Sequence, residues 1–317
     1  MAQYRDSLPQ LKGGLFLTDA GIETTLIFHE GIDLPYFAAF DLLKDQAGQA
    51  ALRRYYSSHA SIARNSDCGF ILESATWRAS ADWGAKLGYR EADMAEVNRQ
   101  AIALLVELRR LFETDRSPMV ISGCVGPRGD GYRVENAMTA AAAQAYHAKQ
   151  IDVFAGTAAD MVTAITMTYA EEAIGVTKAA QAAGMPVAIS FTVETDGRLP
   201  SGQSLKDAIS AVDAATGKGP AYYMINCAHP DHFEDALKAG EGWLKRIKGL
   251  RANASRMSHA ELDEATVLDD GNPTELGQQY RALRERLPQI TVLGGCCGTD
   301  HRHIEAICHA CTAAEAA

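Results

Sequence analysis

The sequence contains the stretch Ile290-Thr291-Val292-Leu293-Gly294-Gly295-Cys296-Cys297-Gly298-Thr299. Its apolar, β-branched first half indicates a buried strand, and the glycines that follow permit an irregular turn at the strand's end. Similar short apolar runs recur about every forty residues, and each of them is followed by a helical pattern. With the last run, Ile290–Gly294, the predicted strands are Leu15–Asp19, Gly69–Glu73, Met119–Gly123, Asp160–Ile165, Val187–Thr192, Tyr222–Asn226 and Leu250–Ala254.

Amphipathic stretches such as Met94–Phe112, Thr139–Gly156 and Thr274–Leu287 separate these runs. Strands that alternate with helices predict a parallel sheet, because each parallel connection needs a crossover. Eight such units in 317 residues favour a (β/α)₈ TIM barrel. The alternative is a doubly wound sheet, which would carry a glycine-rich phosphate turn after its first strand. Asp19–Glu23 is not such a turn.

The composition predicts one α/β domain over residues 1–317, with the barrel core at about 12–310, because no long linker divides the chain. A net charge of −10 argues against nucleic acid or an anionic membrane as partner, and no apolar run is long enough to span a bilayer. The start of the chain lacks the apolar segment of a secretory signal. Seven cysteines without a disulfide-framework spacing predict reduced thiols or metal ligands in the cytoplasm. A homo-oligomer is left open.

Cysteines follow two of the predicted strands. Cys227 follows the sixth strand, and Cys296 and Cys297 follow the eighth. The carboxyl ends of barrel strands share one rim, so we expect the three side chains to lie together. Three thiolates bind Zn²⁺ tightly and leave the fourth tetrahedral position open, which is typical of a catalytic site. The open position would suit a soft ligand such as a substrate thiol.

This metal site has two alternatives. Neighbouring side chains in a strand point to opposite faces, so Cys296 and Cys297 converge only on an irregular backbone; a vicinal disulfide or two inert thiols would need no metal. Histidines after the cysteines could instead complete a closed, structural Cys/His site. We favour the open site because three cysteines suffice and the histidines are predicted to start helices on the outside. These histidines are His229, His232, His301 and His303.

The chain resembles the homocysteine S-methyltransferase family, a zinc-dependent (β/α)₈ group that contains betaine– and S-methylmethionine–homocysteine methyltransferases. The family's Gly-Gly-Cys-Cys-Gly-Thr motif stands at Gly294–Thr299, and its Asn-Cys stands at Asn226-Cys227. Three further motifs are similar to those of the family, namely Asp19–Thr24 for Asp-Gly-Gly-x-x-Thr, Ser74–Ser80 for Thr-x-Thr-Tyr-Gln-Ala-Ser, and Arg251–Asn253 for Tyr-Pro-Asn.

The resemblance implies a Zn²⁺-dependent transfer of a methyl group from a small sulfonium or quaternary ammonium donor to homocysteine or a related thiol. It implies catalytic roles for Asp19 and for the metal ligands Cys227, Cys296 and Cys297. Asp19 would otherwise be a helix cap. A cationic donor needs aromatic faces, and Trp77 is the first candidate among Trp77, Trp83, Tyr132 and Phe191. The predicted substrate-binding residues are Asp19, Thr76, Trp77, Glu194 and Asn253.

One position departs from the family. Its members carry Glu-Thr at the end of the fourth strand, where the glutamate receives the homocysteine amine, and this chain has Ile165-Thr166. Isoleucine cannot balance an ammonium group, so either Glu73 or Glu194 replaces the glutamate or the acceptor lacks the amine. The competing functional hypothesis is a zinc-binding barrel without methyl transfer, which acts as a binding or metal-handling protein.

Overall fold

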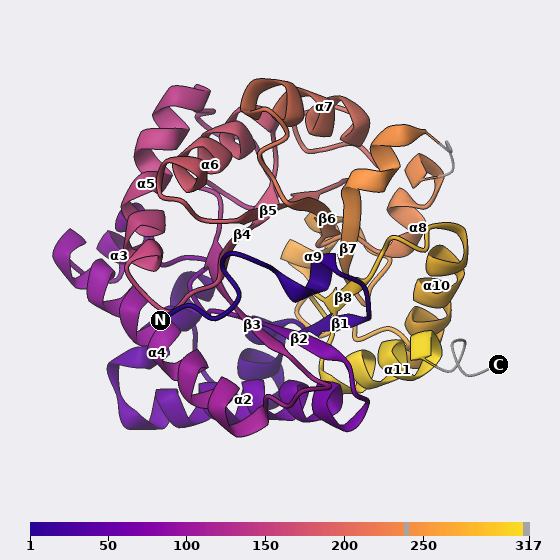
Figure 1. Ribbon diagram of the computed structural model, residues 1–317, viewed down its shortest axis with the longest axis horizontal. Helices are drawn as coiled ribbons and strands as arrows, with labels where there is room; N and C mark the ends of the chain where they lie inside the picture. Colours follow the sequence, from indigo (N-terminus) through magenta and orange to yellow (C-terminus); the bar gives the residue numbers. More distant parts are fainter. Residues whose placement is uncertain (238–240, 313–317) are drawn as a thin grey trace.

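The protein folds as a closed barrel of eight parallel strands. We describe a computed structural model, which defines residues 1–237 and 241–312. The strands pair in chain order, and the last pairs with the first, so that Phe16 is in register with Val292. Figure 1 shows the strands at the centre and the helices in a ring around them. The predicted (β/α)₈ architecture is confirmed.

The strands lie close to their predicted positions. β7 begins three residues earlier than predicted, at Ile247, because Lys248 and Gly249 interrupt the apolar pattern but still belong to the strand. The other differences are of one to two residues at strand ends. The strands are β1 Phe16–Thr18, β2 Gly69–Glu73, β3 Met119–Val125, β4 Met161–Met167, β5 Val187–Thr192, β6 Tyr222–Asn226, β7 Ile247–Ala252 and β8 Val292–Gly295.

In the part of the chain that the structure describes, seven long helices cover the outside of the barrel: α2 Gln46–Asn65, α4 Glu91–Phe112, α5 Ala140–Ala155, α6 Ala170–Ala182, α7 Leu205–Thr216, α10 Pro273–Arg286 and α11 His301–Thr312. Four short helices of this part lie in loops: α1 Ile22–Thr24, α3 Ala81–Lys86, α8 Pro230–Phe233 and α9 His259–Glu264. Within the described residues, no helix has both the length and the apolar character needed to cross a bilayer.

The core has two parts. A large apolar cluster fills the space between the strands and the helices, and a smaller one, which includes Ile71, Met161 and Tyr222, lies inside the barrel. Side chains alternate along barrel strands, so the residue two positions after an inward-facing one also points inward, one layer nearer the carboxyl rim. After Ile71 on β2 this residue is Glu73, and after Met161 on β4 it is Thr163; both are buried. The inside of the barrel is therefore polar beneath its carboxyl rim.

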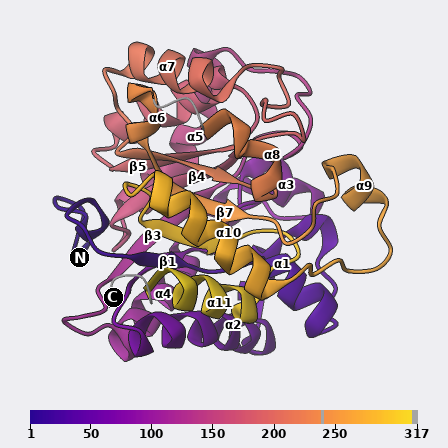
Figure 2. The same cartoon turned by 90° about the vertical axis from the view of Figure 1, so that its right-hand side faces the viewer.

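The loops after the strands gather at one end of the barrel. Figure 2 shows α1, α3 and α9 toward this end and the amino terminus toward the opposite end. The residues predicted for the site follow or end β1, β2, β5, β6, β7 and β8. All of them therefore belong to the same rim.

Candidate metal centre

Three cysteines converge at the carboxyl rim. The Sγ atoms of Cys227, Cys296 and Cys297 all lie within 4.8 Å of one another. Among the described residues they form the only group of three or more His, Cys, Asp or Glu side chains that is spaced to hold a metal ion. None of the four histidines belongs to it, and Cys124, buried on β3, stays outside it as well.

Two of the three sulfurs are bonded to each other. Cys227 and Cys296 form a disulfide, whereas Cys297 is a free thiol whose Sγ lies 3.8 Å from that of Cys227. The sequence predicted reduced thiols or metal ligands, with a disulfide between the adjacent cysteines or two inert thiols as the alternative. The disulfide joins Cys227 to Cys296 instead of Cys296 to Cys297, and the three sulfurs are still spaced to hold a metal ion. The physical reason is the convergence itself, which brings sulfurs from two loops within bonding reach. Once reduced, the three thiols form a compact donor set for a thiophilic metal with one position left for a further ligand.

Glycines shape the loop that carries Cys296 and Cys297. Gly298 has a φ of +79°, and a Cβ there would stand 2.8 Å from the carbonyl oxygen of Asp269. The Thr299 hydroxyl donates to the Cys296 carbonyl at 2.7 Å, and the Cys296 amide donates to the Ala252 carbonyl at 2.8 Å. These contacts fix the irregular turn that brings two adjacent cysteines to one point.

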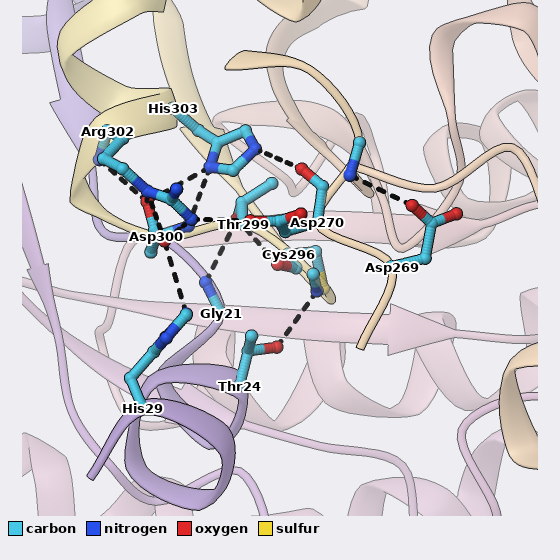
Figure 3. Close-up of polar contacts among 12 residues, drawn as sticks. Gly21, Thr24, His29, Asp269, Asp270, Cys296, Thr299, Asp300, Arg302 and His303 are labelled. Atoms are coloured by element: carbon cyan, nitrogen blue, oxygen red, sulfur yellow. Dashed lines mark hydrogen bonds and ion pairs between the residues drawn. The ribbon is translucent and has the colours of Figure 1, made fainter. Parts of the chain in front are cut away.

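The segment after β1 is fastened to the same loop. The Gly21 amide donates to the Thr299 carbonyl at 3.2 Å, and the Gly298 amide donates to the Thr24 hydroxyl at 3.0 Å (Figure 3). Helix α1 therefore lies directly against the cysteine loop.

Asp300 anchors the far end of this loop. Its carboxylate accepts a hydrogen bond from Arg302 at 2.6 Å, and ring nitrogens of His303 and His29 lie 3.2 and 3.3 Å away (Figure 3). Burial opposes ionisation, but the contacts with His303 and Arg302 hold the pKa of Asp300 well below its usual range. His303 is fully buried and also contacts the Asp270 carbonyl, at 2.8 Å, so it is committed to this network and not to a metal.

Cys227 is held in an unusual backbone conformation. Its φ is +54°, and Thr166 at the end of β4 also has a positive φ, +66°. The side chain of Asn226 links the two segments, because its Oδ1 accepts from the Thr166 amide at 3.0 Å and its Nδ2 donates to the Thr166 hydroxyl at 2.9 Å. β4 shifts register between Ala164 and Met167, which marks a bulge at this point. Strained residues of this kind are typical of functional sites.

Tyr132 covers the cysteines. Its Oη lies 3.3 Å from Cys297 Sγ and 3.7 Å from Cys227 Sγ. Burial, with a contribution from Cys297, raises the pKa of the phenol well above its usual value, so the hydroxyl keeps its proton. Its ring packs on that of His259, with the centroids 4.2 Å apart.

His259 links this cover to the predicted residue Glu194. One ring nitrogen lies 3.1 Å from the Glu194 carboxylate, and the other lies 2.5 Å from the Cys227 carbonyl. Glu194 is thus at the rim, as predicted, but its carboxylate is occupied by a side chain of the protein. No sequence pattern pointed to His259, which begins the short helix α9 in a long loop.

Asp19 is not a free carboxylate. It is buried at the end of β1, its Oδ1 lies 2.8 Å from Arg251 Nη1, and its Oδ2 accepts from the Tyr55 hydroxyl at 3.0 Å. Arg251 occupies the first position of the family's Tyr-Pro-Asn motif, and its side chain is buried as well. The ion pair neutralises Asp19, so a substrate ammonium group would have to compete with a buried guanidinium.

The other predicted substrate-binding residues differ in what they offer. Thr76 is fully buried, and its hydroxyl donates to the Cys124 carbonyl at 2.7 Å, which is a structural contact. Asn253 is also buried, but its Oδ1 has no hydrogen-bond partner among the described residues and could accept one from a ligand. Trp77 is partly exposed and donates to the Ile165 carbonyl at 3.4 Å.

A cation of the protein already stacks on Trp77. The guanidinium of Arg78 lies 3.9 Å from the centroid of the Trp77 ring and 3.7 Å from that of Trp83. Arg78 is buried and donates to the Gly129 carbonyl at 2.8 Å. A donor cation would therefore need another face of Trp77. Phe191 is not at the mouth at all: it lies in the outer core and stacks on Tyr223, because its strand position points away from the barrel interior.

The fold and the site together define a (β/α)₈ protein with a three-cysteine, metal-binding centre at the carboxyl rim. The family model described as homocysteine S-methyltransferase matches residues 16–311. The chain belongs to this family, and it is an S-methyltransferase.

Solved structures of the homocysteine methyltransferase MmuM from Escherichia coli share the fold. The metallated form has a TM-score of 0.76 at 18% identity and covers 98% of this chain and 100% of that one. The oxidized form has a TM-score of 0.73 at 19% identity, covering 96% and 99%, and the apo form has 0.68 at 17%, covering 95% and 98%. No curated protein matches the chain.

Proposed function

We propose that this S-methyltransferase uses zinc to move a methyl group from a small sulfonium or quaternary ammonium donor to homocysteine or a related thiol. The observation that carries the proposal is the group of three Sγ atoms within 4.8 Å of one another at the rim of a barrel of this family. Cys227, Cys296 and Cys297 would hold the metal, which, when bound, keeps an acceptor thiol deprotonated at neutral pH. Thiolate ligands persist in a reducing compartment, which supports a cytoplasmic location.

The protein's own residues would position the reaction. The acceptor sulfur forms a bond to the methyl carbon while the bond from that carbon to the donor's S⁺ or N⁺ breaks. The electron pair of the broken bond stays on the leaving group, which departs neutral, so no general acid is required. Tyr132, as an un-ionised phenol above Cys297, excludes water and can donate a hydrogen bond to sulfur. Asn253 Oδ1 is an acceptor for a polar group of either substrate.

Labelled substrates would test this function. The reduced, zinc-loaded protein is incubated with homocysteine and with methyl-labelled S-methylmethionine or betaine, and methionine is followed by mass spectrometry. We expect labelled methionine from at least one donor, and we expect Cys297→Ser to lose both zinc and turnover. Protein that holds zinc through these cysteines but methylates no thiol from either donor would instead support the metal-handling barrel.

A further inference from the structure

The mouth of the barrel lacks the glutamate that the family places at the end of β4. Ile165 stands there, with 7% of its surface exposed, at the bulge next to Thr166. An ammonium group buried beside isoleucine without a partner would be unfavourable. If the acceptor is an amino thiol, another carboxylate must face its amine.

Two rim carboxylates are already engaged. Asp19 lies 2.8 Å from Arg251, and Glu194 lies 3.1 Å from His259. Each pairs with a side chain of the protein, so neither has its full charge available for a substrate ammonium group.

Glu73 is also unsuitable, although its carboxylate has no hydrogen-bond partner of good geometry among the described residues. It is buried inside the barrel, and this burial raises its pKa to about 7 although the nearby Thr163 and Ser122 hydroxyls oppose the rise. Thr163 precedes Ile165 by two positions and so lies one layer deeper. The charge of Glu73 also acts on Tyr222, in the apolar cluster inside the barrel. Glu73 is therefore beneath the mouth.

The charges of two further carboxylates, Asp263 and Glu23, act on Tyr132. Asp263 is exposed on α9, which leaves Glu23 as the partly buried candidate. It lies in α1, between Gly21 and Thr24, and both of these residues are hydrogen-bonded to the cysteine loop (Figure 3). A Cβ on Gly21 would stand 2.5 Å from the Cys296 carbonyl oxygen, which shows how closely α1 and the loop are packed. Glu23 is partly exposed, and no ion pair is formed by its carboxylate within residues 1–237 and 241–312.

The Glu23 carboxylate is close to groups from several elements of the rim. Burial raises its pKa to about 7, and the charges of Arg78, after β2, and Arg251, on β7, oppose that rise. The charge of Glu23 in turn contributes to the raised pKa of Tyr132, in the loop after β3. Glu23 is therefore near the loops after β2 and β3 as well as the cysteine loop.

We propose that Glu23 receives the α-ammonium group of an amino-thiol acceptor, in place of the glutamate that β4 lacks. This inference rests on the proposed function for the identity of the acceptor. The amine of homocysteine is separated from its sulfur by two methylene groups and the α-carbon, so a thiol bound at the cysteine cluster brings its ammonium group toward the neighbouring α1. In this chain the carboxylate that binds the amine of the acceptor would therefore lie in α1, after β1, and not at the end of β4.

A binding experiment separates this role from methyl transfer. The reduced protein is loaded with Co²⁺, and thiol binding is followed by sulfur-to-cobalt charge-transfer absorption. Homocysteine is compared with 4-mercaptobutanoate, which has the same chain but no amine. Glu23→Gln should weaken homocysteine binding roughly 10- to 100-fold, the range for a lost hydrogen bond to a charged group, and leave 4-mercaptobutanoate unchanged.

Three variants complete the test. Glu171→Gln, an exposed carboxylate at the start of α6, and Glu73→Gln should both keep the wild-type ratio of the two affinities. Adding Ile165→Glu to Glu23→Gln should restore the preference for homocysteine, which also shows that the variant is folded. An equal loss for both thiols in Glu23→Gln, or a changed ratio in Glu73→Gln, would overturn the proposal.

The outcomes distinguish this inference from the proposed function. Selective, Glu23-dependent binding of homocysteine without methyl transfer from any onium donor would support the inference and reject the function. Methyl transfer to homocysteine that is unaffected by Glu23→Gln would support the proposed function and reject the inference about Glu23.

Discussion

Asp19 and Arg251 form a buried ion pair at the mouth of the barrel, with a distance of 2.8 Å between Oδ1 and Nη1. Asp19→Asn would leave the guanidinium buried without its partner, and removal of one member of a buried pair costs about 3–5 kcal/mol. We expect a loss of this size in the free energy of unfolding measured with urea. The exposed pair Arg53–Glu107 is the control, where Glu107→Gln should change stability by less than about 1 kcal/mol. If Asp19→Asn abolishes turnover at unchanged stability, Asp19 acts on the substrate as the family resemblance implies.

Glu73 is a buried acid whose ionisation opposes folding. Burial raises its pKa from 4.5 to about 7, so between these values the folded chain binds more protons than the unfolded chain. The free energy of unfolding therefore falls as the pH rises through this window. Glu73→Gln should be more stable than wild type at pH 8, by at most about 3 kcal/mol, and of similar stability at pH 5.

Urea unfolding at these two pH values would measure the difference. For the exposed residue Glu171, the difference in free energy of unfolding between Glu171→Gln and wild type should be the same at both pH values. An advantage of Glu73→Gln that does not depend on pH would mean that Glu73 is ionised across the whole range.

At the scale of elements, the bulge of β4 and the loop after β6 depend on one side chain. Asn226 Oδ1 accepts from the Thr166 amide and, at 2.6 Å, from the Ser190 hydroxyl. Asn226→Ala would leave these buried donors unpaired and should lower the free energy of unfolding by about 2–4 kcal/mol. Because Cys227 follows directly, zinc content should fall as well. Ser190→Ala removes one donor only and should cost about 1 kcal/mol with zinc retained. Full zinc occupancy in Asn226→Ala would show that the Cys227 conformation does not depend on this amide.

The elements also show what sequence patterns can predict. β2, β5 and β6 lie at the predicted residues, because each is a short, mainly apolar run whose length fits a strand. Convergence of Cys227 with Cys296 and Cys297 follows from strand ends alone. The β4 bulge could not be predicted, because Ile165 and Thr166 are ordinary strand residues. The contact seen at the bulge is a hydrogen bond from the Thr166 amide to the side chain of Asn226, which belongs to another strand.

Pairings between distant loops were equally hidden. Nothing in the local sequence indicates that Arg251 forms an ion pair with Asp19, that His259 pairs with Glu194, or that Arg78 stacks between two tryptophans. Residue type and spacing thus predicted the cysteine cluster, which is spaced to hold a metal ion, whereas the substrate-binding residues depend on which charges the fold leaves unpaired. The proposed role of Glu23 could not be predicted from the sequence for the same reason.

For the whole molecule, the cysteine cluster connects the end of β6 to the end of β8, on either side of β7. A metal bound there stabilises only the folded state, by about 2.7 kcal/mol when its free concentration is a hundred times its Kd. We expect zinc to raise the Tm of the reduced protein by about 5 °C, at the lower end of the shift per kcal/mol for large domains. A chelator should reverse this rise, as differential scanning calorimetry would show.

The disulfide provides the internal control for this last prediction. With Cys227 and Cys296 oxidised, two of the three donors are lost, so neither zinc nor the chelator should move the Tm. In the reduced Cys297→Ser variant, zinc should raise the Tm only slightly. In Cys308→Ser, a residue in α11 and outside the cluster, zinc should raise the Tm as much as in the wild type. An equal effect of zinc on Cys297→Ser and on the reduced wild type would place the stabilising metal elsewhere in the molecule. That result would remove the basis for a thiol acceptor at this rim, because the open coordination position would no longer be here.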